Sequence, residues 1–516
     1  MTNWTAESEA AFDAYVDALI GVIGHADRAE PLKDYCLGLL MPLERKSVEP
    51  LAAVAAPSRV SAKHQSLLHF VGQAPWSDAA LLARVRDWVL PRIEQHGPIR
   101  AWIVDDTGFP KKGKHSVGVA RQYCGQLGKQ DNCQIAVSLS IANDAASLPI
   151  AYQLYLPHSW AEDPEQRKKA KIPAQITFQT KPQIALAQIK TAKAEGVAPG
   201  VVLADAGYGA DGSFRAGLSE LDLSYVVGVQ PTLSVWRPGE SPLPPKPWSG
   251  RGRPPSRVGR TDKHKPISAK ALAEEFDAET WRTIAWREGT NTELNSRFAA
   301  VRLRPASRDY NRPEAHAEEW LLIEWPEGEV EPSKYWLSTL PADATITQLV
   351  DAAKLRWRIE RDYQELKQEL GLGHYEGRGW RGFHHHASLC IAAYGFLVSL
   401  RETIPPSAPA RAQGRQTPGL PDGYRPRGSS DPTRAARPDL DPDHPATPDC
   451  GPGQPSATMS VAQEPWTVRV RSAIYDAVRL SLCRKIISKV ARFSGKHRAG
   501  DSSPLRGRRG SVRNVA

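Results

Sequence analysis

The sequence predicts a mixed α/β protein: a helical N-terminal region, then a region of strands and helices that includes a Trp-rich, strand-like stretch. Two observations support this fold class. Apolar residues recur at helical spacing up to about residue 97, and short apolar runs with turn residues between them begin at residue 100. Strands come first in this second region and then alternate with helices, which is typical of a mixed α/β layout.

The elements follow in order along the chain. "AFDAYVDALIGVIG" and "DAALLARVRDWVLPRIEQ" have helical apolar spacing, and Ser77 is a suitable N-cap for the second helix. We expect strands at 101–106, 117–123, 133–143, 148–156, 201–205 and 224–229, and helices at 182–196 and 213–221. Strand-like, Trp-rich pieces follow at 280–289, 298–306 and 318–325, then a strand at 334–340, a helix ending at Gly371 and an apolar helix over 384–400.

Composition restricts the protein's location and partners. The six cysteines form no CxxC pair, no run of 18 apolar residues exists, and the N-terminus is acidic. These features predict a cytoplasmic protein without a membrane span, a zinc site or a disulfide framework. The net charge is +10, but residues 466–516 alone carry +11, so the rest of the chain is nearly neutral. A nucleic-acid partner must therefore be argued from local residues.

Two acidic motifs follow apolar strands. "AWIVDDTGF" leads into Asp105, Asp106 and Thr107, and "VVLADAGYG" leads into Asp205. Ligands of open α/β sheets bind where strands end, although an Asp there can also simply cap the following helix. Carboxylates without a nearby His or Cys cluster suit Mg²⁺ or Mn²⁺. Two such ions can act on one phosphodiester.

The stretch "RWRIERDYQELKQEL" places a third carboxylate beside cations. On a regular helix Arg356, Glu360 and Lys367 share a narrow stripe next to an apolar one formed by Leu355, Ile359, Tyr363, Leu366 and Leu370. A cation four residues before Glu is the weaker order for a helical ion pair. Two interpretations remain open: a carboxylate that binds metal between cations that bind phosphates, or a solvated charged face.

Together these motifs resemble the RNase H-like DDE transposases of bacterial insertion sequences. The late helix is similar to their Tyr-Arg-Glu-Lys signature, with Arg356, Glu360 and Lys367 at the matching spacing and Ala353 at the position of the Tyr. The family's Asp-x-Thr/Ser motif selects Asp105 over Asp106, and strand alternation agrees because Asp105 and Thr107 share a face.

The resemblance implies a domain arrangement. Residues 98–230 and 333–402 would form the RNase H-like catalytic domain, with the β-rich insertion at 231–332. Residues 1–97 would form a helical, DNA-binding domain. Residues 403–465 are rich in Pro, Gly and Arg and should be a disordered linker before the basic tail at 466–516.

The resemblance also implies a function. Asp105, Asp205 and Glu360 would be both catalytic residues and ligands of two Mg²⁺ (or Mn²⁺) ions. The protein would cleave transposon ends and join them to target DNA by two-metal-ion phosphodiester hydrolysis and transesterification. Its partners would be double-stranded DNA and a second copy of the chain, in a bacterial cytoplasm at the nucleoid. The alternatives are a catalytically silent or domesticated DNA-binding relative, and an RNase H-like nuclease that does not join strands.

Other positions carry alternative interpretations. By the resemblance Trp336 would stack on a DNA base; a core Trp is the alternative. Arg251 and Arg253, in "GRGRPP", resemble an element that lies in AT-rich minor grooves, although a basic linker has the same composition. The run from His384 to His386 could bind metal, but partly exposed imidazoles at a helix start are expected.

Overall fold

The computed structural model describes residues 4–288 and 293–403. All of them belong to one of the two compact units into which the chain divides. Except for Thr403, the predicted linker and basic tail lie outside the described residues. No helix in the described ranges is both long and apolar enough to cross a membrane.

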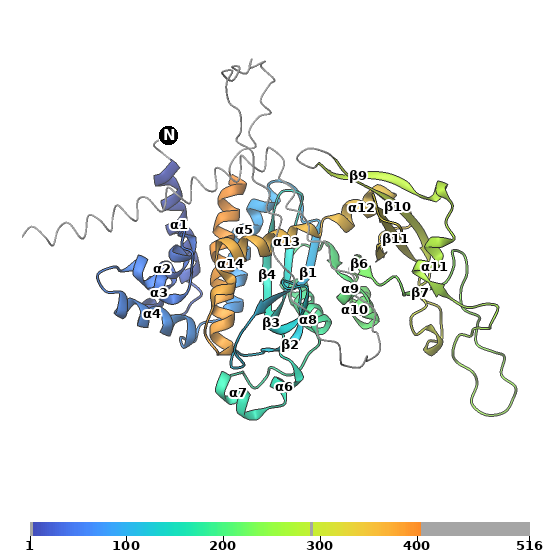
Figure 1. The fold of residues 1–516 in the computed structure, drawn as a ribbon, viewed down its shortest axis with the longest axis horizontal. Coiled ribbons are helices and arrows are strands. Elements are labelled where there is room, and N and C mark those ends of the chain that lie inside the picture. The colour runs from blue at the N-terminus through green and yellow to red at the C-terminus, as the bar shows by residue number, and fades with distance from the viewer. Residues whose placement is uncertain (1–3, 289–292, 404–516) are drawn as a thin grey trace, which may run out of the picture. The chain divides into compact units, whose positions relative to one another are not determined.

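A mixed sheet forms the centre of the described part (Figure 1). β1 (Ala101–Pro110) pairs antiparallel with β3 (Lys129–Ala142) and parallel with β5 (Val201–Ala204). β5 pairs in parallel with β6 (Tyr225–Val229), while β2 (Ala120–Cys124) and β4 (Ser147–Leu154) pair antiparallel with β3. This arrangement confirms the predicted RNase H-like mixed α/β fold.

The β-rich segment continues the same sheet. β12 (Lys334–Ser338) joins β6 antiparallel, and β11 (Glu319–Pro326), β10 (Glu293–Leu303) and β9 (Arg282–Glu288) follow in that order. A separate two-stranded sheet pairs β7 (Ser234–Val235) with β8 (Ile267–Ser268). The strands that carry the acidic motifs and those of the β-rich segment therefore share one hydrogen-bonded layer.

Along the chain, one group of helices precedes the first strand, and the others lie between or after the strands. The N-terminal helices are α1 (Trp4–Ile20), α2 (Ala29–Leu40), α3 (Val48–Ala55), α4 (Val60–Gly72) and α5 (Asp78–Glu94), and Ser77 caps α5 as predicted. The later helices are α6 (His158–Ala161), α7 (Pro164–Ala170), α8 (Lys181–Ala194), α9 (Ala206–Gly209), α10 (Gly212–Glu220), α11 (Ala269–Glu274), α12 (Ile346–Lys354), α13 (Trp357–Gln364) and α14 (Trp380–Thr403).

α14 joins the N-terminal helices to the sheet. It contacts α2, α4 and α5 as well as β4, and almost all of its side chains are buried (Figure 1). The Tyr15 hydroxyl donates to Ala392 O at 2.7 Å, and the rings of Phe12 and Phe396 lie 5.1 Å apart. One continuous hydrophobic core consequently includes both the N-terminal helices and the strands of the sheet.

The predicted helix before Gly371 consists of three pieces. α12 ends at Lys354, α13 begins at Trp357, and residues Glu365–Glu369 form a π-helical turn. Gly371 has φ 70°, which suits glycine and ends the segment where predicted. The apolar stripe of this stretch is buried as expected, but the break and the π turn mean that one regular helical wheel does not describe it.

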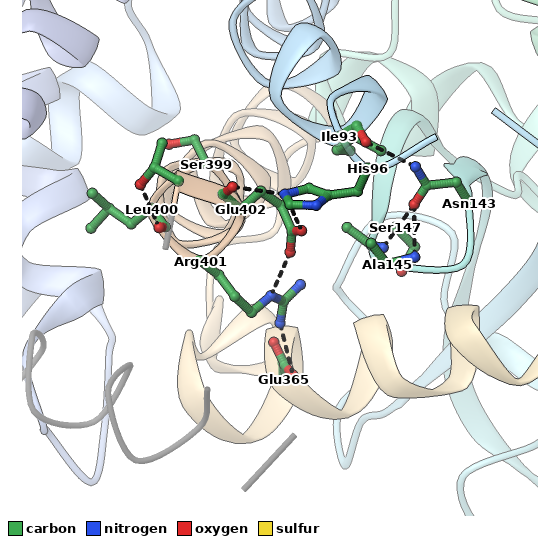
Figure 2. A network of polar contacts seen from close by, with 12 residues as sticks. Ile93, His96, Asn143, Ala145, Ser147, Glu365, Ser399, Leu400, Arg401 and Glu402 are labelled. Atoms are coloured by element: carbon green, nitrogen blue, oxygen red, sulfur yellow. Dashed lines mark hydrogen bonds and ion pairs between the residues drawn. The ribbon is translucent and has the colours of Figure 1, made fainter. Parts of the chain in front are cut away.

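Polar contacts fasten the end of α14 to its neighbours (Figure 2). His96, just after α5, bonds through Nε2 to Glu402 O at 2.8 Å, and Arg401 Nε donates to the Glu402 carboxylate at 3.2 Å. Arg401 Nη1 also lies 3.9 Å from Glu365 in the π turn. Asn143 donates to Ile93 O at 2.8 Å, which ties the end of β3 to α5. The ends of three helical segments thus meet around buried polar groups.

The prediction of partly exposed imidazoles at residues 384–386 is wrong. His384, His385 and His386, here called the histidine seam, are 6%, 2% and 1% exposed. Their ring nitrogens bond to protein groups: His384 to Trp380 O and Leu154 N, His385 to Val71 O and Trp76 O, and His386 to Tyr35 and Gly371 O. They lie inside the packing of α14 because its N-terminal turn is covered by α2, α4 and β4.

Candidate active site

Asp105 lies in the middle of β1. The strand was expected to end at Asp106, but it continues to Pro110 because β3 pairs with it along its whole length. β5 pairs with β1 only as far as Ile103, opposite Leu203. Asp105 therefore lies just beyond the point where β1 and β5 separate, and its side chain is 13% exposed.

Asp205 directly follows β5 and caps the short helix α9. Its Oδ1 accepts from the backbone N–H of Gly207 at 2.9 Å and of Tyr208 at 3.4 Å. The capping interpretation of this residue is therefore realised in the fold. Both of these bonds use the same oxygen, Oδ1, so capping and ligand binding through Oδ2 are compatible at this carboxylate.

Arg356 connects the first and third acidic motifs. Its Nη2 lies 2.9 Å from Asp105 Oδ2 and its Nη1 lies 3.1 Å from Glu360 Oε1. The Arg356 side chain is 22% exposed and that of Glu360 is 52% exposed, so the pair spans the boundary between core and solvent. We call Asp105, Asp205, Arg356 and Glu360 the acidic site.

The electrostatics join all three carboxylates to this one cation. Burial would lower the pKa of Arg356, but the charges of Asp105, Asp205 and Glu360 together raise it. Burial raises the pKa of Asp105 to about 7, Arg356 opposes the rise, and Asp205 and Asp106 add to it. The pKa of Asp105 is raised mainly because its carboxylate is removed from water, and the negative charges of Asp205 and Asp106 contribute less.

The chemistry of this donor set suits a hard divalent cation. Its polar atoms are carboxylate oxygens, the donors that Mg²⁺ and Mn²⁺ prefer. Within residues 4–288 and 293–403, no group of three His, Cys, Asp or Glu side chains is arranged closely enough to hold a metal ion. Arg356 instead supplies the positive charge between Asp105 and Glu360.

Asp106 points to the opposite face of β1. Its Oδ2 lies 2.8 Å from Lys181 Nζ at the start of α8, and the Tyr208 hydroxyl donates to it at 3.3 Å. Tyr208 belongs to α9, the helix that Asp205 caps. Asp106 thus helps to fix the segment that carries Asp205, while Asp105 faces Arg356.

Lys367 reaches β1 and makes no ion pair with Glu360 among the described contacts. Its Nζ donates to Gly108 O at 2.9 Å and to Gln126 Oε1 at 3.2 Å, at the tip of the β2–β3 hairpin. Burial lowers its pKa to about 8. Lys367 therefore contacts β1 three residues beyond Asp105 along the strand.

Sequence reasoning missed the polar role of Tyr363. Its hydroxyl lies 2.7 Å from Ser138 Oγ and donates to Asp105 O at 3.3 Å. The only signal was its position three residues after Glu360, where it was assigned to the apolar stripe. Ala353, at the place of the signature Tyr, is buried between α12 and the sheet, so a hydroxyl reaches the acidic site from Tyr363 instead.

The remaining predicted DNA contacts lie away from the acidic site. Trp336 is in β12, half-buried against the core beneath α12. Arg251 and Arg253 are exposed on the long connection between β7 and β8. No described contact links these three side chains to Asp105, Asp205 or Glu360, and their roles stay predictions.

Comparisons with known proteins identify the family. A family model described as "DDE superfamily endonuclease" matches residues 18–293, which is more than half of the 516 residues. The match contains Asp105 and Asp205 and ends before Glu360. A probable transposase for insertion sequence element IS701, from Microchaete diplosiphon, is 31% identical over 202 residues. Those residues cover 39% of this chain and 49% of that protein, so the chain spans about half the length of this curated relative. The chain belongs to the DDE superfamily endonucleases.

Proposed function

We propose that this protein is a DNA transposase that cleaves the ends of its element and joins them to target DNA. The observation that carries the proposal is the Arg356 guanidinium, which contacts Asp105 and Glu360 although 255 residues separate these carboxylates along the chain. The name of the matched relative, a probable insertion-sequence transposase, supports the same class of reaction.

In this proposal Asp105, Asp205 and Glu360 hold Mg²⁺ or Mn²⁺, as two ions. Endonucleases of this superfamily generally use divalent metals. When bound, such ions supply Lewis-acid activation of the attacking oxygen and stabilisation of the leaving oxygen. The assignment is supported by the charges of all three carboxylates, which act together on the pKa of the one Arg356 guanidinium.

The chain's own residues would orient the DNA. Arg356 and Lys367 both end near β1 and can pair with phosphates on either side of the cleaved bond. Water would attack the phosphodiester at the element's end first, and the freed 3′-OH would then attack the target strand. The same three carboxylates serve both steps because each is an in-line displacement at phosphorus.

Other contacts complete the proposal. The N-terminal helices would bind double-stranded DNA, Arg251 and Arg253 would enter a minor groove, and Trp336 would stack on a base. Two copies of the chain, one on each end, would act together. The protein would work in a bacterial cytoplasm at the nucleoid.

The test uses the full chain with a linear DNA that carries the element's end. Nicking, double-strand cleavage and joining to a plasmid are measured with Mg²⁺ and after chelation by EDTA. We expect cleavage and joining that need the metal and that are lost in Asp205→Asn. Cleavage without joining would identify a nuclease, and end binding without cleavage would identify a silent DNA-binding relative; either result overturns the proposal.

A further inference from the structure

The last residue of α12 extends its ammonium group into a cage of aromatic side chains. Lys354 Nζ lies 4.0 Å from the ring centroid of Trp286, 5.5 Å from that of Phe298 and 5.8 Å from that of Trp336. These rings come from β9, β10 and β12. The face of an aromatic ring attracts positive charge, so three rings around one ammonium form a site selective for a cation.

A buried carboxylate completes the cage. Glu324 of β11 is only 2% exposed and accepts from Lys354 Nζ at 2.6 Å and from Ser296 Oγ at 2.8 Å. Lys334 approaches its other oxygen at 3.7 Å from a largely exposed position. A carboxylate removed from water needs a close cation, and Lys354, itself 11% exposed, is the nearer one.

The caged lysine lies at a junction in the chain. α12 and α13 cover one face of the continuous sheet, in a core cluster that includes Phe298 and Leu322 of the insertion and Ile103 and Leu203 of the catalytic strands. Helical geometry breaks between Lys354 and Trp357. Only the buried Leu355 separates Lys354 from Arg356, the cation of the acidic site.

We propose that Lys354 is a positioning residue through which the β-rich insertion sets the place of Arg356, and so of Asp105 and Glu360. The insertion holds Lys354 by the rings of Trp286 and Phe298 and by the Glu324 carboxylate, β12 adds the Trp336 ring, and Lys354 holds the start of α13. The proposal rests on the proposed function, since its main measurement is DNA cleavage. It also gives Trp336 an intramolecular partner that the sequence did not indicate.

The first test is Lys354→Met, which keeps the length and apolar stem of the side chain and removes its charge. We expect the cleavage rate of bound DNA to fall ~10-fold or more, because small displacements of catalytic groups are costly. Affinity for the DNA end should change less than about twofold, because Lys354 is enclosed by protein groups. Lys354→Arg should recover most of the rate. Lys334→Met is the matched control and should cleave normally.

A charge exchange separates the cage from an ordinary ion pair. Lys354→Glu combined with Glu324→Lys restores an ion pair but places a carboxylate over three ring faces. We expect no recovery of cleavage relative to Lys354→Met. Recovery in the exchanged variant would overturn the cage, as would normal cleavage by Lys354→Met. A fall in melting temperature without a fall in rate per folded molecule would show a purely structural role and overturn the positioning role.

Hydrogen exchange keeps the two proposals distinguishable. In Lys354→Met the amides of residues 355–364 should exchange faster than in the unaltered chain, while those of α14 should not change. This measurement needs no DNA. If the unaltered chain cuts no DNA, the proposed function fails and exchange still decides the positioning role. Unchanged exchange at 355–364 would overturn it.

Discussion

Ionisable side chains are buried in two parts of this molecule, and they are held there in opposite ways. In the acidic site the side chains share a cation: one guanidinium contacts both Asp105 and Glu360. In the histidine seam burial lowers the pKa of each imidazole, to about 4 for His385 and His386. His386 accepts from the Tyr35 hydroxyl and donates to Gly371 O, which satisfies a neutral ring completely.

This difference indicates which of the two groups of buried side chains can exchange its protein partner for a ligand. An ion pair beside solvent can exchange its partner for a metal ion or a phosphate, because the replacement also carries charge. The neutral imidazole of His386, bonded to one backbone carbonyl and one buried hydroxyl, carries no charge to exchange. The acidic site should therefore control activity with little effect on stability, and the histidine seam should do the reverse.

The largest expected effect separates the two adjacent aspartates of β1. Asp105→Asn should lower the single-turnover nicking rate by about 100-fold or more, the order found when one electrostatic group of an active site is removed. Asp106→Asn should stay within about tenfold of the unaltered rate, because Asp106 bonds to Lys181 and Tyr208 on the other face. Loss of nicking in Asp106→Asn alone would reverse the assignment.

Asp205→Asn should be equally inactive but normally folded. The Asn Oδ1 atom can still accept from Gly207 and Tyr208, so α9 keeps its cap. We expect unchanged affinity for the DNA end and a change in unfolding free energy below about 0.5 kcal/mol. Gel-shift titration and urea unfolding measure both. A strongly destabilised Asp205→Asn would show that the negative charge of this carboxylate stabilises the fold, and would contradict a role confined to the acidic site.

The histidine seam should respond to pH through stability. The pKa of His386 is about 4 in the fold and ~6.5 when unfolded. Because the folded value is the lower one, the stabilisation is present above pH 6.5 and is lost as pH falls toward 4. His386 should account for about 2 kcal/mol of the fall in unfolding free energy between pH 7.5 and pH 5. Urea unfolding at the two pH values should show a smaller fall in His386→Ala.

His386→Ala should also be less stable at neutral pH, by about 2–4 kcal/mol, because it leaves the Tyr35 hydroxyl and Gly371 O without their partner. Its cleavage rate per folded molecule should be normal. A selective loss of that rate would break the proposed contrast between the two regions.

Lys367→Ala should give the smallest effect on DNA. If Lys367 binds a phosphate, the slope of log affinity against log salt should flatten by roughly one unit. Loss of the bond to Gly108 O should cost about 1 kcal/mol of stability. Gln126→Ala is the matched control, since it removes the neighbouring partner without changing charge. An identical salt slope in Lys367→Ala and the unaltered chain would exclude the phosphate contact.

The sequence predicted the local parts of this fold well. Strand alternation put Asp105 and Thr107 on one face, and apolar runs located the strand before Asp205. Periodicity reports that a residue is buried but not what covers it. It therefore could not reveal that β12 pairs with β6 and makes one sheet of the catalytic strands and the insertion.

The errors have a similar cause. A run of three histidines looks polar until the helices that enclose it are known, and those helices come from residues more than 300 positions earlier. Tyr363 lay correctly in the apolar stripe, but its hydroxyl found Ser138 across the sheet. The role of such amphipathic side chains depends on partners that are far away in the sequence. The spacing of residues within one stretch of the chain does not reveal those partners.

The placement of α14 has a consequence for how the protein is made. Its Phe396 and Ala392 complete the packing around Phe12 and Tyr15, at the opposite end of the described chain. During synthesis the N-terminal helices leave the ribosome well before residue 380 is added. The apolar side chains that pack against α14 therefore stay uncovered until α14 has been made. Contacts of such long sequence separation form late in folding. The packing of the N-terminal helices is thus completed only after α14 has been made.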